Sequence, residues 1–85
     1  MQQPVAVITG AGRGIGRATA VALARLGYRV ALLARSEREL EETATLSGGG
    51  LVCRADVSRT DEVEGAVATV IERLGRIDAA IHCAG

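Results

Sequence analysis

Short apolar runs alternate with longer amphipathic segments along the chain. Four runs rich in Val, Ile, Leu and Ala lie at residues 5–9, 29–34, 51–55 and 77–82. Short, continuous apolar runs of this kind are typical of strands that are buried on both faces of a parallel sheet. The third run, LVCRA, is less apolar than the first two, so we predict that it forms an edge of the sheet.

Helical periodicity marks the segments that separate these runs. A first helix is predicted by apolar residues at helical spacing, namely Ile15, Ala18, Ala22 and Leu26. Gly27 follows them where a helix end favours a left-handed residue. Ser36 and Glu39 form a capping-box pattern that predicts a second helix to about residue 46.

The third helical segment has the most regular pattern. Its apolar residues recur at helical intervals, at Val63, Ala66, Val67, Val70, Ile71 and Leu74. Ser58 or Thr60 is a candidate cap at its start, and Gly75 is predicted to close it.

Strands that alternate with helices indicate an α/β fold with a parallel sheet. We predict one unit over residues 1–85: a partial, doubly wound parallel sheet of four strands in the order 3-2-1-4, with three helices. Right-handed crossovers then place the first two helices on one face and the third on the other. Strand four becomes an open edge and apolar surface stays exposed, so residues 1–85 alone are expected to be marginally folded or self-associated.

Composition limits the classes of partner. Ten Arg balance ten Asp and Glu, so the formal net charge of zero gives no overall field that attracts nucleic acid or an anionic membrane. No run approaches the roughly 18 apolar residues that cross a bilayer, and we expect a cytoplasmic protein. Cys53 and Cys83 lack C-x-x-C spacing, so we predict two buried thiols, no redox dithiol and no metal ligand.

A glycine-rich loop, TGAGRGIG at residues 9–16, lies between the first strand and the first helix. Backbone amides at a helix amino terminus attract phosphate, and glycines let the backbone approach a pyrophosphate closely. The spacing of Gly10, Gly14 and Gly16 differs from the G-x-G-x-x-G fingerprint, and the absence of Gly-Lys-Ser/Thr excludes a P-loop. A tight turn without a ligand is the alternative, but the position of the loop in a βαβ unit favours phosphate binding.

The loop after VAVI, the DV pair after the third strand and the final AG resemble the amino-terminal half of the classical short-chain dehydrogenase/reductase family. The resemblance extends over essentially all 85 residues. It implies a Rossmann-like domain, a nicotinamide dinucleotide, and hydride transfer between nicotinamide and an alcohol or carbonyl substrate. It also assigns Gly10, Gly14 and Gly16 to the pyrophosphate loop and gives Ile15 a backbone contact there.

The resemblance assigns the DV pair to the adenine. Asp56 would accept a hydrogen bond from the adenine amino group, with the backbone of Val57 beside it. The alternative for Asp56 is a cap or turn residue before the last helix.

The end of strand four matches the family's Asn-Asn-Ala-Gly motif only in part. Ala84 and Gly85 match it, and the resemblance implies that they line the cofactor. His82 and Cys83 occupy positions that are usually Asn. A lone histidine is a general acid or base only beside a partner, so we interpret His82 as a hydrogen-bonding substitute for Asn.

The end of strand two indicates which nicotinamide cofactor binds. NAD calls for a carboxylate that accepts the ribose 2′-hydroxyl, whereas the 2′-phosphate of NADP calls for arginine. Arg35 occupies this place and Ser36 follows, so we predict NADP(H) rather than NAD(H), with both residues at the cofactor. Arg13 adds a second positive charge, although a solvated side chain is the alternative for each arginine. Three other arginines are interpreted as solvated: Arg17, Arg25 and Arg38.

We assign no catalytic residue. In this family a serine polarises the substrate oxygen, and a Tyr-x-x-x-Lys pair exchanges a proton with it. Tyr28 is the only tyrosine and lysine is absent, so we predict a fragment: the cofactor half of a longer, homo-oligomeric NADP-dependent oxidoreductase. The alternatives are a non-catalytic NADP(H)-binding module or truncated remnant, a methyltransferase-like Rossmann protein, and a purely structural module.

Overall fold

Seven elements follow the alternation that the sequence predicts. The computed structural model describes residues 3–83 of the chain. The elements are β1 (Val5–Thr9), α1 (Gly14–Arg25), β2 (Arg29–Ala34), α2 (Glu37–Leu46), β3 (Leu51–Arg54), α3 (Thr60–Leu74) and β4 (Ala79–His82). Within the described residues, no helix is long and apolar enough to cross a membrane.

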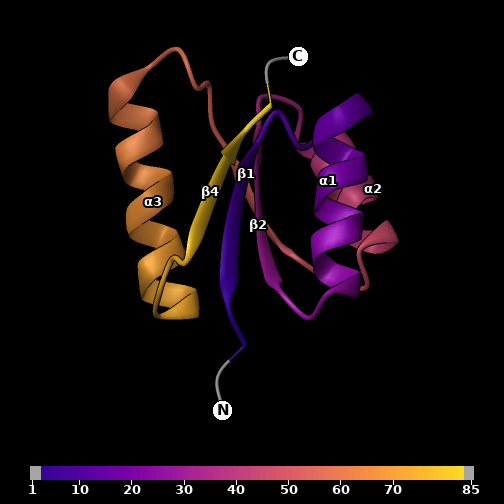
Figure 1. The fold of residues 1–85 in the computed structure, drawn as a ribbon. Coiled ribbons are helices and arrows are strands. Elements are labelled where there is room, and N and C mark those ends of the chain that lie inside the picture. Colours follow the sequence, from indigo (N-terminus) through magenta and orange to yellow (C-terminus); the bar gives the residue numbers. More distant parts are fainter. Residues whose placement is uncertain (1–2, 84–85) are drawn as a thin grey trace.

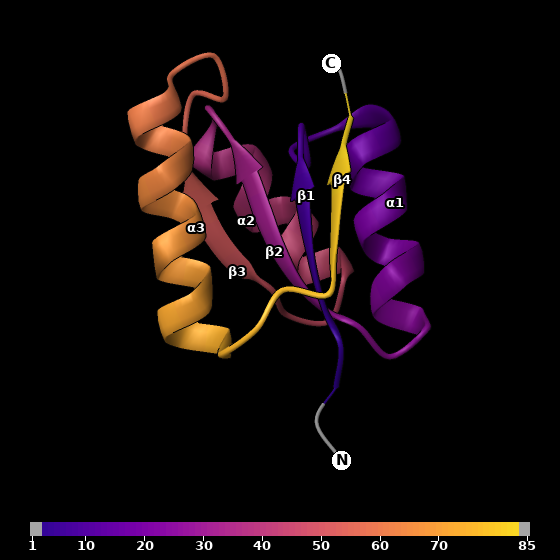
Figure 2. The same cartoon turned by 60° about the vertical axis from the view of Figure 1, so that its left-hand side comes forward.

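The strands form a parallel sheet in the order β3-β2-β1-β4, which confirms the predicted topology. In the centre, β1 pairs with β2 from Val5 opposite Arg29 and with β4 from Ala6 opposite Ala79. The edges are β3, as predicted, and β4. Helices α1 and α2 cover one face of the sheet and α3 covers the other (Figure 1 and Figure 2).

Alternate side chains of the strands point into two separate hydrophobic cores. The core beneath α3 comprises Val5, Val7, Ala31, Leu33, Cys53, Ala55, Ala66 and Val70. The core beneath α1 and α2 comprises Ala6, Ile8, Ala11, Ala20, Val30, Leu32 and Leu40. Because β1 and β2 contribute to both cores, they are buried on both faces, which explains their continuous apolar sequences.

Helix α1 faces the sheet with a different side from the one that its apolar spacing marks. The side chains of Ile15 and Leu26 are 76% and 75% exposed, whereas Gly16 and Ala20 are buried. Small residues bring the helix close to the strands, and their weak hydrophobic signal hides the buried face in the sequence. Gly27, which follows the helix, has a φ of 97° as predicted.

Helix α3 buries Ala66 and Val70 but leaves Val67 and Ile71 exposed, so its apolar arc is wider than the surface it covers. The predicted caps are wrong: Arg59 is the N-cap residue and makes no side-chain cap hydrogen bond. Thr60 is instead the first helical residue, and Ser58 is used in a turn described below. The predicted end is confirmed, because the C-cap Gly75 is left-handed.

Strand β4 begins two residues later than the sequence predicts, because Asp78 precedes it with its side chain bonded to the sheet. Asp78 Oδ2 accepts a hydrogen bond from the backbone N–H of Val5 at 2.8 Å, and Asp78 N donates to Val5 O at 2.8 Å. The Arg76 guanidinium binds the same carboxylate at 2.7 Å. Hydrogen bonds from Arg76 and then from Val5 hold the pKa of Asp78 below its ordinary value.

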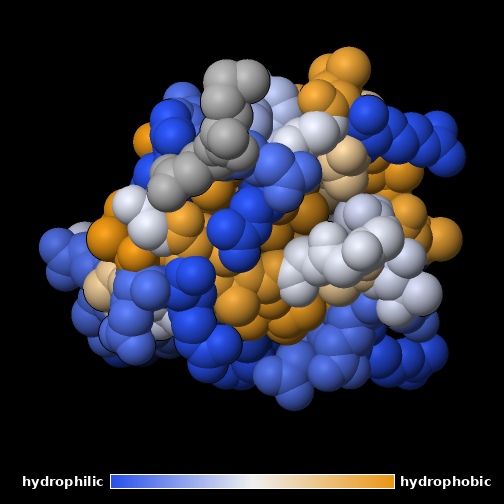
Figure 3. Space-filling view, turned by 90° about the horizontal axis from the view of Figure 1, so that it is seen from below, coloured by the Kyte–Doolittle hydropathy of each residue, from blue (hydrophilic) through white to orange (hydrophobic). Residues whose placement is uncertain are grey.

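The amino ends of the strands form a surface at the opposite end of the sheet from the glycine loop. Figure 3 shows a hydrophobic area in the middle of this face with polar residues around it. A cavity of about 520 Å³ lies among the residues of this end, including Val30, Leu51 and Leu74. Arg29 and Arg73 also line it.

The exposed apolar faces of α1 and α3 predict self-association of residues 1–85 when they are produced alone. We expect the apparent mass to rise with concentration in sedimentation velocity, since β4 is also an open edge. A variant with Leu26→Glu and Ile71→Lys keeps the net charge and should stay closer to the monomer mass. A monomer that unfolds in one cooperative transition at all concentrations would contradict this prediction.

Asp78 predicts a pH dependence of stability. Its pKa is lowered in the folded chain, so its contribution is present above the ordinary value of 3.8 and is lost as the pH falls through the folded pKa. Asp78→Asn should therefore lower the free energy of unfolding at neutral pH, and the difference from the wild type should shrink in acid. Urea denaturation at a series of pH values measures this, with the exposed Glu41→Gln as control. A pH-independent difference between Asp78→Asn and the wild type would refute the assignment.

Candidate functional site

A cavity of about 550 Å³ lies at the carboxyl ends of the strands. Its lining residues are Gly10, Gly12, Arg13, Ala34, Arg35, Ser36, Glu39, Ala55, Asp56, Val57, Ser58, His82 and Cys83. They come from the carboxyl ends of the strands and the loops that follow them, except Glu39, which belongs to α2. In open α/β sheets, ligands bind at this edge, where neighbouring strands lead to helices on opposite faces.

The glycine loop requires glycine at the positions that the sequence indicates. Gly10 has a φ of 65°, and a β-carbon there would overlap the carbonyl oxygen of Cys83. A β-carbon on Gly16 would overlap the carbonyl oxygen of Gly10, so α1 can start directly against the loop. Gly14 has a φ of 59° with open space beside it, so it is required by conformation alone.

Gly12 is a fourth glycine of the loop that the sequence reasoning did not assign to the site. It is buried, it lines the cavity, and a β-carbon there would lie 3.0 Å from the Glu39 Cβ. The close contact joins the loop to α2. The alternating Gly-x-Gly pattern from Gly10 to Gly16 was the available signal.

The start of α1 offers backbone donors to an anion. Its N-cap residue, Arg13, is extended and makes no side-chain cap hydrogen bond, and the first turn contains no acidic residue. N–H groups of an uncapped first turn lack intrahelical partners and attract negative charge. The side chain of Ile15 is mostly exposed in this turn, and its predicted role, a backbone contact, stays a prediction.

Arg35 and Ser36 lie at the end of β2, where the sequence places them. The side chain of Arg35 is exposed and lines the cavity together with that of Arg13. The Ser36 hydroxyl accepts a hydrogen bond from Glu39 N at 3.3 Å, which confirms its predicted role as the cap of α2. Glu39 and Asp56 also line the cavity, so its lining includes two acidic residues as well as the two arginines.

Asp56 is part of a tight turn between β3 and α3. Its Oδ1 atom accepts hydrogen bonds from the hydroxyl of Ser58 at 2.6 Å and from the amide of Ser58 at 3.0 Å. These bonds, and to a lesser extent the positive charges of Arg35 and Arg59, hold the pKa of Asp56 below its ordinary value. The alternative of a turn residue is thus observed. Val57 lines the cavity together with Asp56. For both residues, a contact with adenine stays a prediction.

His82 joins the ends of β1 and β4, as an Asn substitute would. Its Nδ1 atom is 2.7 Å from the Thr9 hydroxyl, and Cys83 N donates to Thr9 O at 3.3 Å. Ala84 and Gly85 lie outside the described residues.

Of the two thiols that were predicted to be buried, Cys53 is buried and Cys83 is only half-buried. Burial raises the pKa of the Cys53 thiol. Within residues 3–83, no group of three His, Cys, Asp or Glu side chains could hold a metal.

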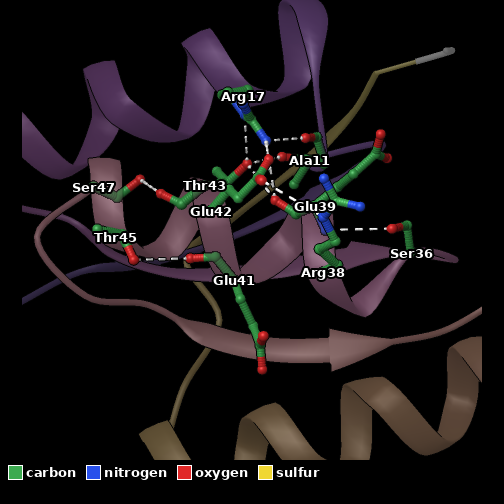
Figure 4. A network of polar contacts seen from close by, with 11 residues as sticks. Ala11, Arg17, Ser36, Arg38, Glu39, Glu41, Glu42, Thr43, Thr45 and Ser47 are labelled. Atoms are coloured by element: carbon green, nitrogen blue, oxygen red, sulfur yellow. Dashed lines mark hydrogen bonds and ion pairs between the residues drawn. The ribbon is translucent and has the colours of Figure 1, made fainter.

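Arg17 is not a solvated residue, which corrects the interpretation from sequence. Its side chain is only 28% exposed, and its guanidinium contacts residues of the glycine loop and α2 (Figure 4). Arg25 is exposed, and the Arg38 side chain is 89% exposed, as expected. A positive charge in the first turn opposes the helix dipole, and this was the sequence signal that Arg17 needs a partner.

The chain matches known proteins over nearly its whole length. A family model described as short chain dehydrogenase matches residues 4–85. The short-chain reductase protein NovJ of Streptomyces niveus is 44% identical over 90 residues, covering 99% of this chain and 34% of NovJ.

Two solved structures are similar in fold and carry nicotinamide dinucleotides. The alcohol dehydrogenase of Thermococcus sibiricus, complexed with 5-hydroxy-NADP, has a TM-score of 0.84 at 48% identity and covers 91% of this chain. The 3-ketoacyl-(acyl-carrier-protein) reductase of Brucella melitensis, complexed with NADH, has a TM-score of 0.87 at 32% identity and covers 93%. The matched regions are 35% and 33% of those chains, so this chain spans about a third of its relatives.

The glycine loop predicts a large cost for Gly10→Ala. The substitution adds a β-carbon at a positive φ against the Cys83 carbonyl, so we expect the free energy of unfolding to fall by about 3 kcal/mol. Gly65→Ala is the matched control, because Gly65 lies in α3 with nothing near its missing β-carbon. That variant should gain about 1 kcal/mol. Urea denaturation compares the two, and equal stability of Gly10→Ala and the wild type would contradict the loop geometry.

Proposed function

The chain belongs to the short-chain dehydrogenase family, and we propose that it is the NADP(H)-binding part of an oxidoreductase. The whole protein would transfer hydride between nicotinamide and an alcohol or carbonyl substrate. The observation that carries the choice of cofactor is Arg35 at the end of β2, in the cavity, where an NAD site has a carboxylate.

The lining of the cavity suits a dinucleotide. Gly10 and Gly16 let the loop pack against the end of β4 and the first turn of α1, and Gly14 has open space beside it, so a pyrophosphate can approach the backbone there. The uncapped start of α1 supplies N–H groups and the positive end of a helix dipole to the same place. We assign the pyrophosphate to this loop, with Gly14 and the backbone of Ile15 in the first turn.

Side chains around the loop would hold the adenosine half. Arg35 has paired donors for a 2′-phosphate, Arg13 adds a second charge, and Ser36 lines the same cavity. We assign the adenine amino group to Asp56, whose Oδ2 atom makes no hydrogen bond within residues 3–83, with the backbone of Val57 beside it. We also assign Ala84 and Gly85, which follow β4 in the sequence, to the lining of the cofactor site.

The bound dinucleotide supplies the hydride chemistry, and the chain's residues bind and orient it. Within the 85 residues there is no lysine, so the Tyr-x-x-x-Lys pair that the family resemblance implies is absent from them. We propose that residues 1–85 bind cofactor weakly and do not catalyse. Catalysis and oligomer formation would belong to a longer protein, and a non-catalytic NADP(H)-binding module is the second candidate.

Reversing the charge at Arg35 tests the cofactor. In the protein as its gene encodes it, Arg35→Asp should weaken NADPH binding about 30-fold and leave NADH binding equal or stronger, because a carboxylate repels the 2′-phosphate. Fluorescence titration gives both Kd values. Arg38→Asp is the matched control, since Arg38 is highly exposed and is not among the residues that line the cavity. Preserved preference for NADPH in Arg35→Asp would refute the assignment.

A further inference from the structure

Two side chains hold successive carbonyl groups of the glycine loop. The hydroxyl of Thr43 donates to the Ala11 carbonyl at 2.8 Å, and Arg17 Nη2 donates to the Gly12 carbonyl at 2.6 Å. The two side chains are themselves joined, because Arg17 Nε donates to Thr43 Oγ1 at 2.9 Å. Figure 4 shows this group between α1 and α2. The loop is therefore fixed by the helix layer as well as by its own glycines.

Holding a carbonyl group also fixes the direction of the next N–H group. In a trans peptide the C=O and N–H bonds point in opposite directions. The Ala11 carbonyl points toward Thr43 and the Gly12 carbonyl points toward Arg17. The N–H groups of the residues that follow, Gly12 and Arg13, therefore point in the opposite direction. Gly12 and Arg13 both line the cavity.

The contacts of Arg17 need a guanidinium rather than any positive charge. Besides its bonds to the loop and Thr43, Nη2 lies 3.1 Å from the Glu39 carbonyl and 3.1 Å from Glu42 Oε1. Thr43 is fully buried, so its hydroxyl has no solvent to replace a lost partner. A planar fork can bond an α2 side chain through Nε while Nη2 bonds the loop, whereas an ammonium group is a single point.

We propose that Arg17, together with Thr43, is a positioning residue for the dinucleotide, which holds the loop in its phosphate-binding conformation before the cofactor arrives. This inference rests on the proposed function. Glycines lose more conformational freedom than other residues when they become ordered, so a loop that is ordered in advance leaves less to be lost on binding. The pyrophosphate is common to NADPH and NADH, so Arg17 supports both cofactors equally, unlike Arg35.

The test compares two arginines in the protein as its gene encodes it. Arg17→Met keeps an unbranched side chain without donors, and it should raise the Kd for NADPH and for NADH by about the same factor, roughly tenfold. Arg38→Met is the matched control, since Arg38 contacts the same Glu42 carboxylate but is 89% exposed. It should leave both Kd values within about twofold.

Two more variants separate positioning from charge and from folding. Arg17→Lys keeps the charge but not the fork, so both Kd values should stay raised; full recovery would overturn the proposal. Thr43→Val removes the hydroxyl at nearly constant shape, should also raise both Kd values, and replaces Arg17→Met if that variant does not fold. Unchanged Kd values with a lower Tm would mean a structural role only and would also overturn it. A wild type that binds neither cofactor would instead refute the proposed function.

Discussion

The structure depends on a place where backbones meet with no side chain between them. The Cys83 carbonyl lies against Gly10, and the Gly10 carbonyl lies against Gly16. This contact joins the end of β4, the end of β1 and the first turn of α1, so it sets the direction in which α1 leaves the sheet. The amino terminus of the helix consequently lies beside the cavity, where a phosphate can meet unpaired N–H groups.

The order of the strands could be predicted because parallel strands and right-handed crossovers leave few topologies to consider. The face of α1 could not. Periodicity identifies a helix but weights large apolar residues, so it marked exposed Ile15 and Leu26 and overlooked buried Gly16 and Ala20. The start of α3 was also wrong, since the hydroxyl of Ser58 bonds Asp56 instead of the helix.

Some residues of the site could be predicted from the sequence and others could not. Six residues that the sequence assigned to the cofactor line one cavity, because they follow the strands whose ends meet there: Gly10, Arg13, Arg35, Ser36, Asp56 and Val57. Arg17 and Thr43 were missed because their partners are remote in sequence. Arg17 bonds a residue 26 positions away, and Thr43 bonds one 32 positions away. Such contacts follow from how α1 and α2 pack, so the charge in the first turn of α1 indicates only that Arg17 needs a partner and does not identify Thr43 as that partner.

Binding of a nicotinamide dinucleotide at the glycine-loop end of the sheet can be tested by titrating the ¹⁵N-labelled protein with NADP⁺ and following the amide chemical shifts. We expect the largest shifts at residues 13–16 and 35–36 and at Asp56 and Val57. Shifts confined to the opposite end, around residues 48–51 beside the second cavity, or no shifts at all, would contradict the account.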